Sequence, residues 1–210
     1  MKLMRLSQIK IISVALLLLC GFVGFAQSNP EHWDAKYYTG YSVQTFKQLP
    51  AVHQKIAGSK FNHRLLDAAL FFRTNEERIR YNLPEFYFSI ALEKAALGHS
   101  IDMVRYNFYS HDSPVPGNQS MTDRIKRVGV DYGTCAENIY NFFDEDPTYW
   151  SLASKLVEGW MNSSGHRSNI LNPNLKYLGC GAWPYKNPEW PNYEWFKSTQ
   201  SFSDRDAQNK

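Results

Sequence analysis

The chain has 210 residues, with 23 Lys and Arg, 20 Asp and Glu, and a hydrophobic fraction of 43%. This length suits one domain, and the near balance of charge predicts neither a nucleic-acid partner nor an anionic membrane surface as a partner. The excess positive charge lies within residues 1–26, and the remaining residues carry 20 charges of each sign.

Residues 1–26 have the pattern of a secretory signal peptide. A basic front precedes an apolar run over residues 11–25, which is shorter than the roughly 20 residues of a membrane-spanning helix. Small residues near the end of this run predict cleavage after Ala26, which gives a secreted protein without stable membrane insertion. An uncleaved signal anchor and a lipid anchor on Cys20 are the alternatives.

Two cysteines remain after this cleavage, Cys135 and Cys180. An exported chain enters a compartment that permits disulfides, and both residues lie in segments that favour strands. We therefore expect a Cys135–Cys180 disulfide, which would close a loop of about 46 residues and stabilise the fold by roughly 3–4 kcal/mol. The alternative is a pair of buried free thiols.

The first half of the mature chain predicts an extension and two helices. Residues 27–62 show no sustained period and predict an N-terminal extension with one short helix. The apolar spacing over 63–80 predicts a helix that ends before Pro84. A second helix begins after Ser89, a good N-cap, and Gly98 inside it predicts close packing of another segment there.

The second half predicts short helices that alternate with strands. A turn at 111–117 leads to a short helix over 120–129, which Gly129 ends. A strand follows at 135–143, then a helix at 151–162, and two strands at 172–185 and 193–204. Helices that cover a small antiparallel sheet, an α+β domain, fit this layout best.

Three segments carry a family resemblance: "NFYSHDS" at 107–113, "CAENIY" at 135–140 and "SSGHRSNIL" at 163–171. Together with Trp160 they resemble the CAP superfamily (the SCP/PR-1-like domain) in its bacterial secreted branch. Further matching motifs are "NEER" at 75–78, "LGCG" at 178–181 and "STQSF" at 198–202. The resemblance covers residues 63–204 and leaves 205–210 as a C-terminal tail.

The resemblance implies an α-β-α sandwich whose small antiparallel sheet lies between helical layers. It also implies a cavity lined by two His and two acidic residues. His111 and His166 match the two His, and Glu137 matches one acid. The second acid is replaced by Ser163, three residues after Trp160, which puts any mechanism that needs two carboxylates in doubt.

Two interpretations of this cavity remain open. Two imidazoles and one carboxylate are ligands that Zn²⁺ or another divalent metal accepts, with a position left for water, provided that Gly165 turns the chain so that His166 faces His111 and Glu137. The same groups also suit a hydrogen-bonded polar cluster without metal, or framework contacts of Glu137 with backbone N–H groups. His99, on the second helix, is expected to be structural or solvated.

Two functions follow from these interpretations. The favoured one is an extracellular binding module for a small apolar or lipid-like ligand, a cell-surface component or a partner protein. The alternative is a metal-assisted, peptidase-like hydrolase in which His111 and His166 hold the metal and Glu137 is a ligand or general base. Neither H-E-x-x-H nor G-x-S-x-G occurs in the chain, so the common zinc-protease and serine-hydrolase motifs give the hydrolase no support.

Overall fold

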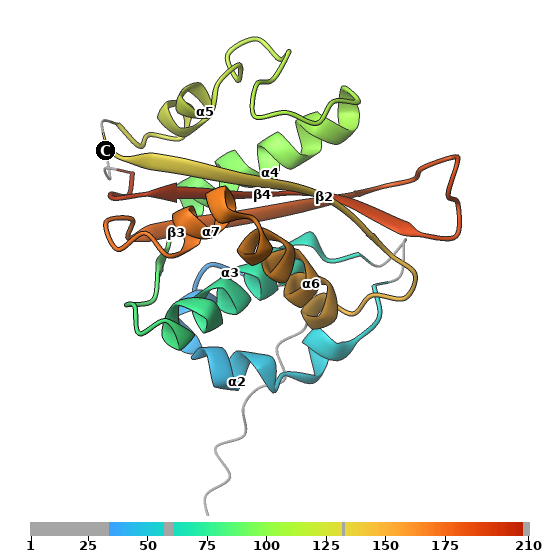
Figure 1. Cartoon of the computed structure of the whole chain (residues 1–210), viewed down its shortest axis with the longest axis horizontal. Helices are drawn as coiled ribbons and strands as arrows, with labels where there is room; N and C mark the ends of the chain where they lie inside the picture. The colour runs from blue at the N-terminus through green and yellow to red at the C-terminus, as the bar shows by residue number, and fades with distance from the viewer. Residues whose placement is uncertain (1–33, 57–60, 132, 208–210) are drawn as a thin grey trace, which may run out of the picture.

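The computed structural model describes residues 34–56, 61–131 and 133–207, so the expected signal peptide lies outside the described residues. A central sheet separates α4 and α5 on one face from α2, α3 and α6 on the other (Figure 1). The elements in chain order are α1 Tyr37–Gly40, α2 Val43–Lys47, the 3-10 helix η2 Pro50–His53, α3 His63–Arg80, β1 Tyr87–Phe88, α4 Ile90–Arg105, α5 Met121–Arg127, β2 Cys135–Asp144, α6 Tyr149–Asn162, α7 Ser164–Ile170, β3 Tyr177–Tyr185 and β4 Glu194–Ser203. The predicted α-β-α sandwich is confirmed.

The sheet has four strands in the order β1-β3-β4-β2. The three long strands pair antiparallel, as predicted. The short strand β1 pairs parallel with β3 through Tyr87 and Phe88, so the sheet is mixed rather than purely antiparallel. With only two residues, β1 was too short to show a period in the sequence.

Capping residues set the helix boundaries, and for α3, α4 and α5 these lie where or close to where the sequence predicted them. The side chain of Asn62 accepts a hydrogen bond from the first turn of α3, and Ser89 does the same for α4. Gly129 follows α5 with a φ of 88°, a conformation that glycine adopts without strain. Helix α6 begins two residues before its predicted start because Thr148 forms a capping box there.

The segment expected to be an extension is part of the core. Val43, Phe46 and Val52 are at most 1% exposed, and the ring of Phe46 stacks on Phe72 of α3 with centroids 4.2 Å apart. Tyr38 stacks on Phe88 in the same cluster. Residues 34–56 therefore cover α3, and the predicted boundary at residue 63 does not mark the edge of the core.

Helix α4 lies unusually close to β3 because of two glycines in the strand. A Cβ on Gly179 would lie 1.9 Å from the backbone nitrogen of Glu93, and one on Gly181 would lie 2.2 Å from that of Leu97. The "LGCG" motif is thus the docking surface for α4. A Cβ on Gly98 would meet nothing within 4 Å, so the prediction of close packing at Gly98 was wrong: the small residues lie on the strand, not on the helix.

The predicted Cys135–Cys180 disulfide is also wrong, since both cysteines are free. Cys135 pairs with Ser203 and Cys180 pairs with Gln200, so the whole width of β4 lies between them. Two strand spacings separate their Cα atoms by more than about 9 Å, and a disulfide tolerates at most about 7 Å. Burial raises the pKa of both thiols, which leaves them weakly reactive.

We expect reduction to leave the stability of the protein unchanged. Without a bridge, dithiothreitol has nothing to cleave, whereas a disulfide closing this loop would contribute roughly 3–4 kcal/mol. Urea unfolding with and without dithiothreitol measures the difference, and Cys135→Ser controls for any intermolecular bridge. A large loss of stability on reduction of the monomer would contradict the free-thiol structure.

Candidate functional site

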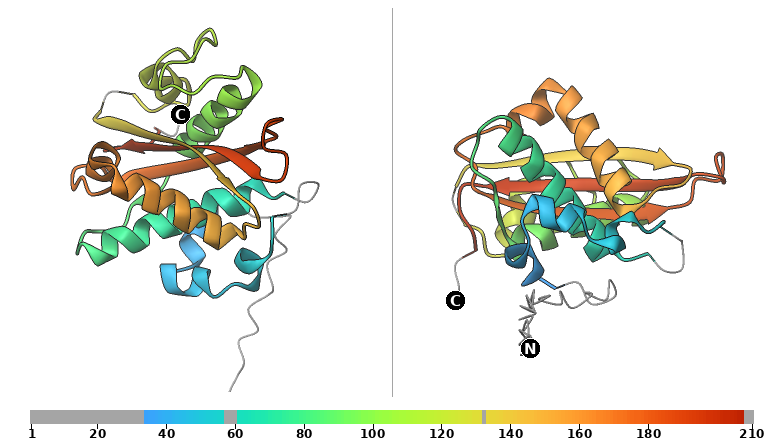
Figure 2. Two further views of the ribbon diagram at one scale, coloured as in Figure 1. Left: turned by 45° about the vertical axis from the view of Figure 1, so that its right-hand side comes forward. Right: turned by 90° about the horizontal axis from the view of Figure 1, so that it is seen from below.

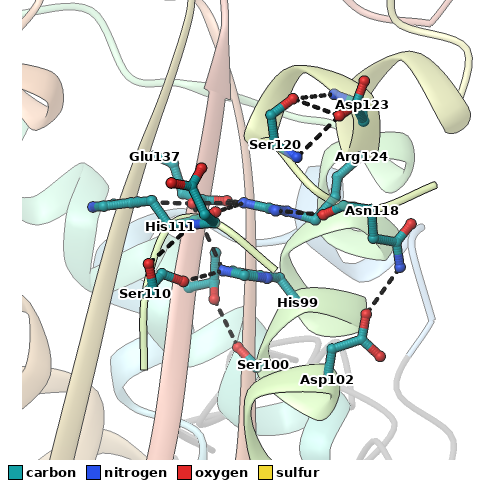
Figure 3. Close-up of polar contacts among 12 residues, drawn as sticks. His99, Ser100, Asp102, Ser110, His111, Asn118, Ser120, Asp123, Arg124 and Glu137 are labelled. Carbon is teal, nitrogen blue, oxygen red and sulfur yellow. Dashed lines mark hydrogen bonds and ion pairs between the residues drawn. The ribbon is translucent and has the colours of Figure 1, made fainter. Parts of the chain in front are cut away.

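Glu137 is the centre of a buried ionic cluster on the face of the sheet that carries α4 and α5. Its side chain is only 2% exposed and projects from β2 (Figure 3). Arg124 Nη2 donates to both carboxylate oxygens at 2.8 Å, and His111 Nδ1 lies 2.9 Å from Oε1. The structure therefore brings His111 and Glu137 together, with Arg124 as their third member.

Arg124 connects this cluster to the loop that precedes α5. Its side chain is 3% exposed, and it donates to the backbone oxygens of His111 at 3.0 Å and Asn118 at 2.9 Å. Arg124 was not predicted to belong to the site. The sequence did contain an indication of its role. Arg124 lies on the same face of a short helix as Met121 and Ile125, where burying an unpaired charge would be costly, so a charged partner could have been expected.

His99 lies beneath the cluster and is fully buried. Its Nε2 donates to the backbone oxygen of Ser110 at 3.0 Å (Figure 3), so Nδ1 is the unprotonated nitrogen, and it has no partner among the described residues. Burial is the main reason that the pKa of His99 falls to about 4. His99 is therefore neutral and fixes the loop that carries His111.

The carboxyl group of Glu137 stays ionised despite its burial. Burial raises its pKa, but the hydrogen bond from His111 and the positive charge of Arg124 outweigh this effect, and the pKa lies below its ordinary value. A general base must accept a proton near the working pH. A carboxylate with a lowered pKa and donors on both oxygens is poorly suited to that role.

His166 approaches this cluster from a different direction. It lies in the first turn of α7. The side-chain amide of Asn138, on β2, donates to the backbone oxygen of His166 at 3.2 Å. Burial lowers the pKa of His166, and so does the neighbouring imidazole of His111. Within the described part of the chain, no hydrogen bond joins the His166 ring to His111 or Glu137.

The turn before His166 is made by Ser163, not by Gly165. Ser163 is extended, with φ −95° and ψ 123°, between α6 and α7. Gly165 lies inside α7, its φ is not positive, and it has open space around it. The predicted glycine turn was therefore wrong. The half-buried side chain of Ser163 forms no hydrogen bond with His111, Glu137 or His166 in the described residues.

The remaining family motifs form a buried framework behind the site. Asn138 donates to Gln200 at 2.9 Å, and Gln200 donates to Thr74 at 2.7 Å. Asn169 donates to Asn138 at 2.9 Å and so joins α7 to β2. Arg78, from "NEER", donates to the backbone oxygen of Ile170 at the end of α7. These contacts hold the "AENI" and "GHRSNIL" segments against the sheet and against each other.

Glu137 is the member of the predicted Zn²⁺ ligand set that this geometry commits to another partner. Residues 34–56, 61–131 and 133–207 contain no group of three or more His, Cys, Asp or Glu placed to hold one. The guanidinium of Arg124 occupies both oxygens of Glu137 and would repel a cation there. The Nδ1 of His111 is committed to the same carboxylate, so Nε2 is its remaining ring nitrogen. Glu137 is therefore not free to act as a metal ligand in this geometry.

Comparison with known proteins agrees with this architecture. The chain is 39% identical over 108 residues to the uncharacterized protein YkwD of Bacillus subtilis, an alignment that spans 51% of this chain and 38% of YkwD. An extracellular protein with an SCP domain from Bacillus anthracis is 31% identical, with a TM-score of 0.55 over 70% of this chain and 42% of that one. The chain thus spans less than half the length of these relatives.

A more distant structure shows the same fold. An outer surface protein of Borrelia burgdorferi superposes with a TM-score of 0.52 at 18% identity, over 73% of this chain and 98% of that one. The model of the CAP, or cysteine-rich secretory protein, family matches residues 71–196, which is more than half of the chain. On this match, and on the fold that carries it, the chain belongs to the CAP (cysteine-rich secretory protein) family.

Proposed function

We propose that this protein is an extracellular binding module and not a metal-assisted hydrolase. The observation that carries the proposal is the contact of Arg124 Nη2 with both carboxylate oxygens of Glu137. It neutralises the carboxylate that a hydrolase would need as ligand or base, and it makes the site rigid. A rigid, charge-compensated site suits recognition, since preorganised groups lose little conformational freedom when a ligand binds.

His111 is the group that this site offers to a ligand. Its side chain is 52% exposed, while Glu137 beside it is almost fully covered. The contact of Nδ1 with Glu137 fixes the ring and leaves Nε2 as the nitrogen available to a partner. The ligand is a lipid-like molecule, a cell-surface component or a protein, and it meets His111 with His166 nearby.

An extracellular location is part of the proposal. The structural relatives are described as an extracellular protein and an outer surface protein, and no helix among the described residues is long and apolar enough to cross a membrane. The basic and apolar leader of residues 1–26 supports export with cleavage after Ala26. N-terminal sequencing of the exported protein tests this: a chain that begins at Gln27 supports it, and one that begins at an acylated Cys20 contradicts it.

Turnover of a broad panel of peptide and ester substrates, with and without a chelator, tests the choice between the two functions. We expect no turnover that depends on added Zn²⁺, and no difference between the wild-type protein and His166→Ala. Glu158→Ala serves as the control, because Glu158 is exposed on α6 away from the cluster. Metal-dependent turnover that disappears in His166→Ala would overturn the proposal in favour of the hydrolase.

A further inference from the structure

One end of the sheet extends beyond the helices that cover the rest of it. Figures 1 and 2 show the hairpin between β3 and β4 projecting past the ends of α4 and α6. Helix α4 ends at Arg105, and the loop that follows it covers only part of the sheet face beyond. This end of the sheet belongs to neither the ionic cluster nor the framework described above.

Three aromatic side chains form a row across this end of the sheet. Phe143 of β2 pairs with Trp195 of β4, which pairs with Tyr185 of β3, so the three residues share one face. Their ring centroids lie 4.6 Å and 5.9 Å apart. Phe143 is 45% exposed, and it makes a T-shaped contact with the ring of Tyr193. Tyr185 and Trp195 are partly buried, so Phe143 is the most exposed ring of the row.

A groove of about 500 Å³ runs beside this row, and Tyr185 is part of both. The opposite wall is the loop after α4, which contributes Tyr109. Polar side chains from the sheet and the hairpin also line the groove, among them Asn141, Asn187 and Lys197. The hydroxyl of Tyr185 donates to Asn141 at 2.9 Å and fixes that amide at the side of the aromatic row.

The charges in the groove are largely compensated. Lys197 is 5% exposed and donates to the backbone oxygens of Met103 and Phe108 at 2.8 Å. Lys186 pairs with Glu194 at 2.6 Å, and Glu189 is the one acid among the described residues that line the groove. A strongly charged ligand therefore finds little complementary charge here, whereas a neutral ligand with many hydroxyl groups finds amides and phenols as partners.

We propose that this groove and aromatic row bind a neutral oligosaccharide. Sugar rings present apolar C–H faces that stack on aromatic rings, whose faces carry negative charge density, and their equatorial hydroxyls pair with amide and phenol groups such as those of Asn141 and Tyr109. The site is distinct from the His111 site, and its failure would leave the proposed function intact.

Isothermal titration of the full chain with chitohexaose and cellohexaose tests this proposal. At least one hexaose should bind saturably, and Phe143→Ala and Tyr185→Ala should each weaken binding about 5- to 10-fold, the effect of one lost aromatic stacking contact. Tyr185→Phe should retain the stacking and lose only the bond to Asn141. Tyr87→Ala is the matched control, because Tyr87 is a 67% exposed aromatic residue on β1 and should not change binding.

Three results would overturn the proposal. They are the absence of saturable binding by either hexaose at millimolar concentration, equal binding by the wild-type protein and both alanine variants, and binding of a decaproline peptide in place of the sugars. A proline-rich peptide also docks on aromatic grooves, so it is the appropriate competitor. If thermal unfolding shows that Tyr185→Ala does not fold, Phe143→Ala decides, because Phe143 is already half exposed.

Discussion

Arg124→Met is expected to lower the free energy of unfolding by about 3–5 kcal/mol, because it leaves the buried carboxylate of Glu137 without its cation. Arg124 also donates to the backbone oxygens of His111 and Asn118, and these bonds are lost with it. Urea unfolding measures the change. Arg127→Met is the control on the same helix: it removes an exposed arginine whose hydrogen bond to Asn118 Oδ1 is also exposed, and it should cost no more than about 0.5 kcal/mol.

The double variant Arg124→Met/Glu137→Leu separates the charge effect from the packing effect. It removes the uncompensated carboxylate, so it should be more stable than Arg124→Met alone, and the coupling energy follows from the double-mutant cycle. A cost for Arg124→Met below about 1 kcal/mol, or no coupling with Glu137, would show that the contact does not hold the site together.

The same contact predicts a dependence on pH. The pKa of Glu137 is lowered in the folded protein, so its stabilising contribution is fully present above the unfolded value near about 4.3 and is lost as the pH falls through the folded pKa. In Arg124→Met the burial of Glu137 remains while the compensating charge is gone. The folded-state pKa of Glu137 should therefore rise in the variant, so acidification should cost Arg124→Met less stability than it costs the wild-type protein.

Gly179→Ala is expected to destabilise the fold severely, by more than about 4 kcal/mol. Its Cβ would lie within 2.6 Å of three backbone atoms of Leu92 and Glu93, and a helix backbone cannot yield as the end of a side chain can. The strand and α4 would have to separate. Loss of the cooperative thermal transition, followed by circular dichroism, is the measurement.

Gly98→Ala is the opposite control, on the α4 side of the same contact between α4 and β3. Gly98 lies in α4 with open space at its Cβ, so alanine should stabilise the protein by up to about 1 kcal/mol. A folded, fully stable Gly179→Ala protein would show that α4 does not pack on β3 as closely as the structure describes.

The sequence predicted the elements with a strong local signal. The apolar stripes over 63–80 and after Ser89, the turn chemistry at Gly129 and the strands at 135–143 and 193–204 all correspond to elements of the structure. Each depends on contacts within one helix or strand, which periodicity and capping residues record. The family motifs then placed His111 and Glu137 in one site.

What the sequence did not predict depends on how distant elements pack. The pairing order places β4 between Cys135 and Cys180, and no local pattern states that order. The glycines that allow α4 to approach the sheet lie on β3, so the close packing predicted at Gly98 occurs at Gly179 and Gly181 instead. The partner of Glu137 is an arginine 13 residues away on another element, and only its position in the apolar stripe of α5 gave a sign of it.

Zinc binding measured by titration calorimetry on the metal-free protein tests the central claim most directly. If Arg124 occupies Glu137, the wild-type protein should show no saturable zinc site that depends on both His111 and His166, and His111→Ala should give the same result as the wild-type protein. A stoichiometric zinc site that disappears in both His111→Ala and His166→Ala would contradict the account, because it would show that these imidazoles share an ion despite the guanidinium of Arg124.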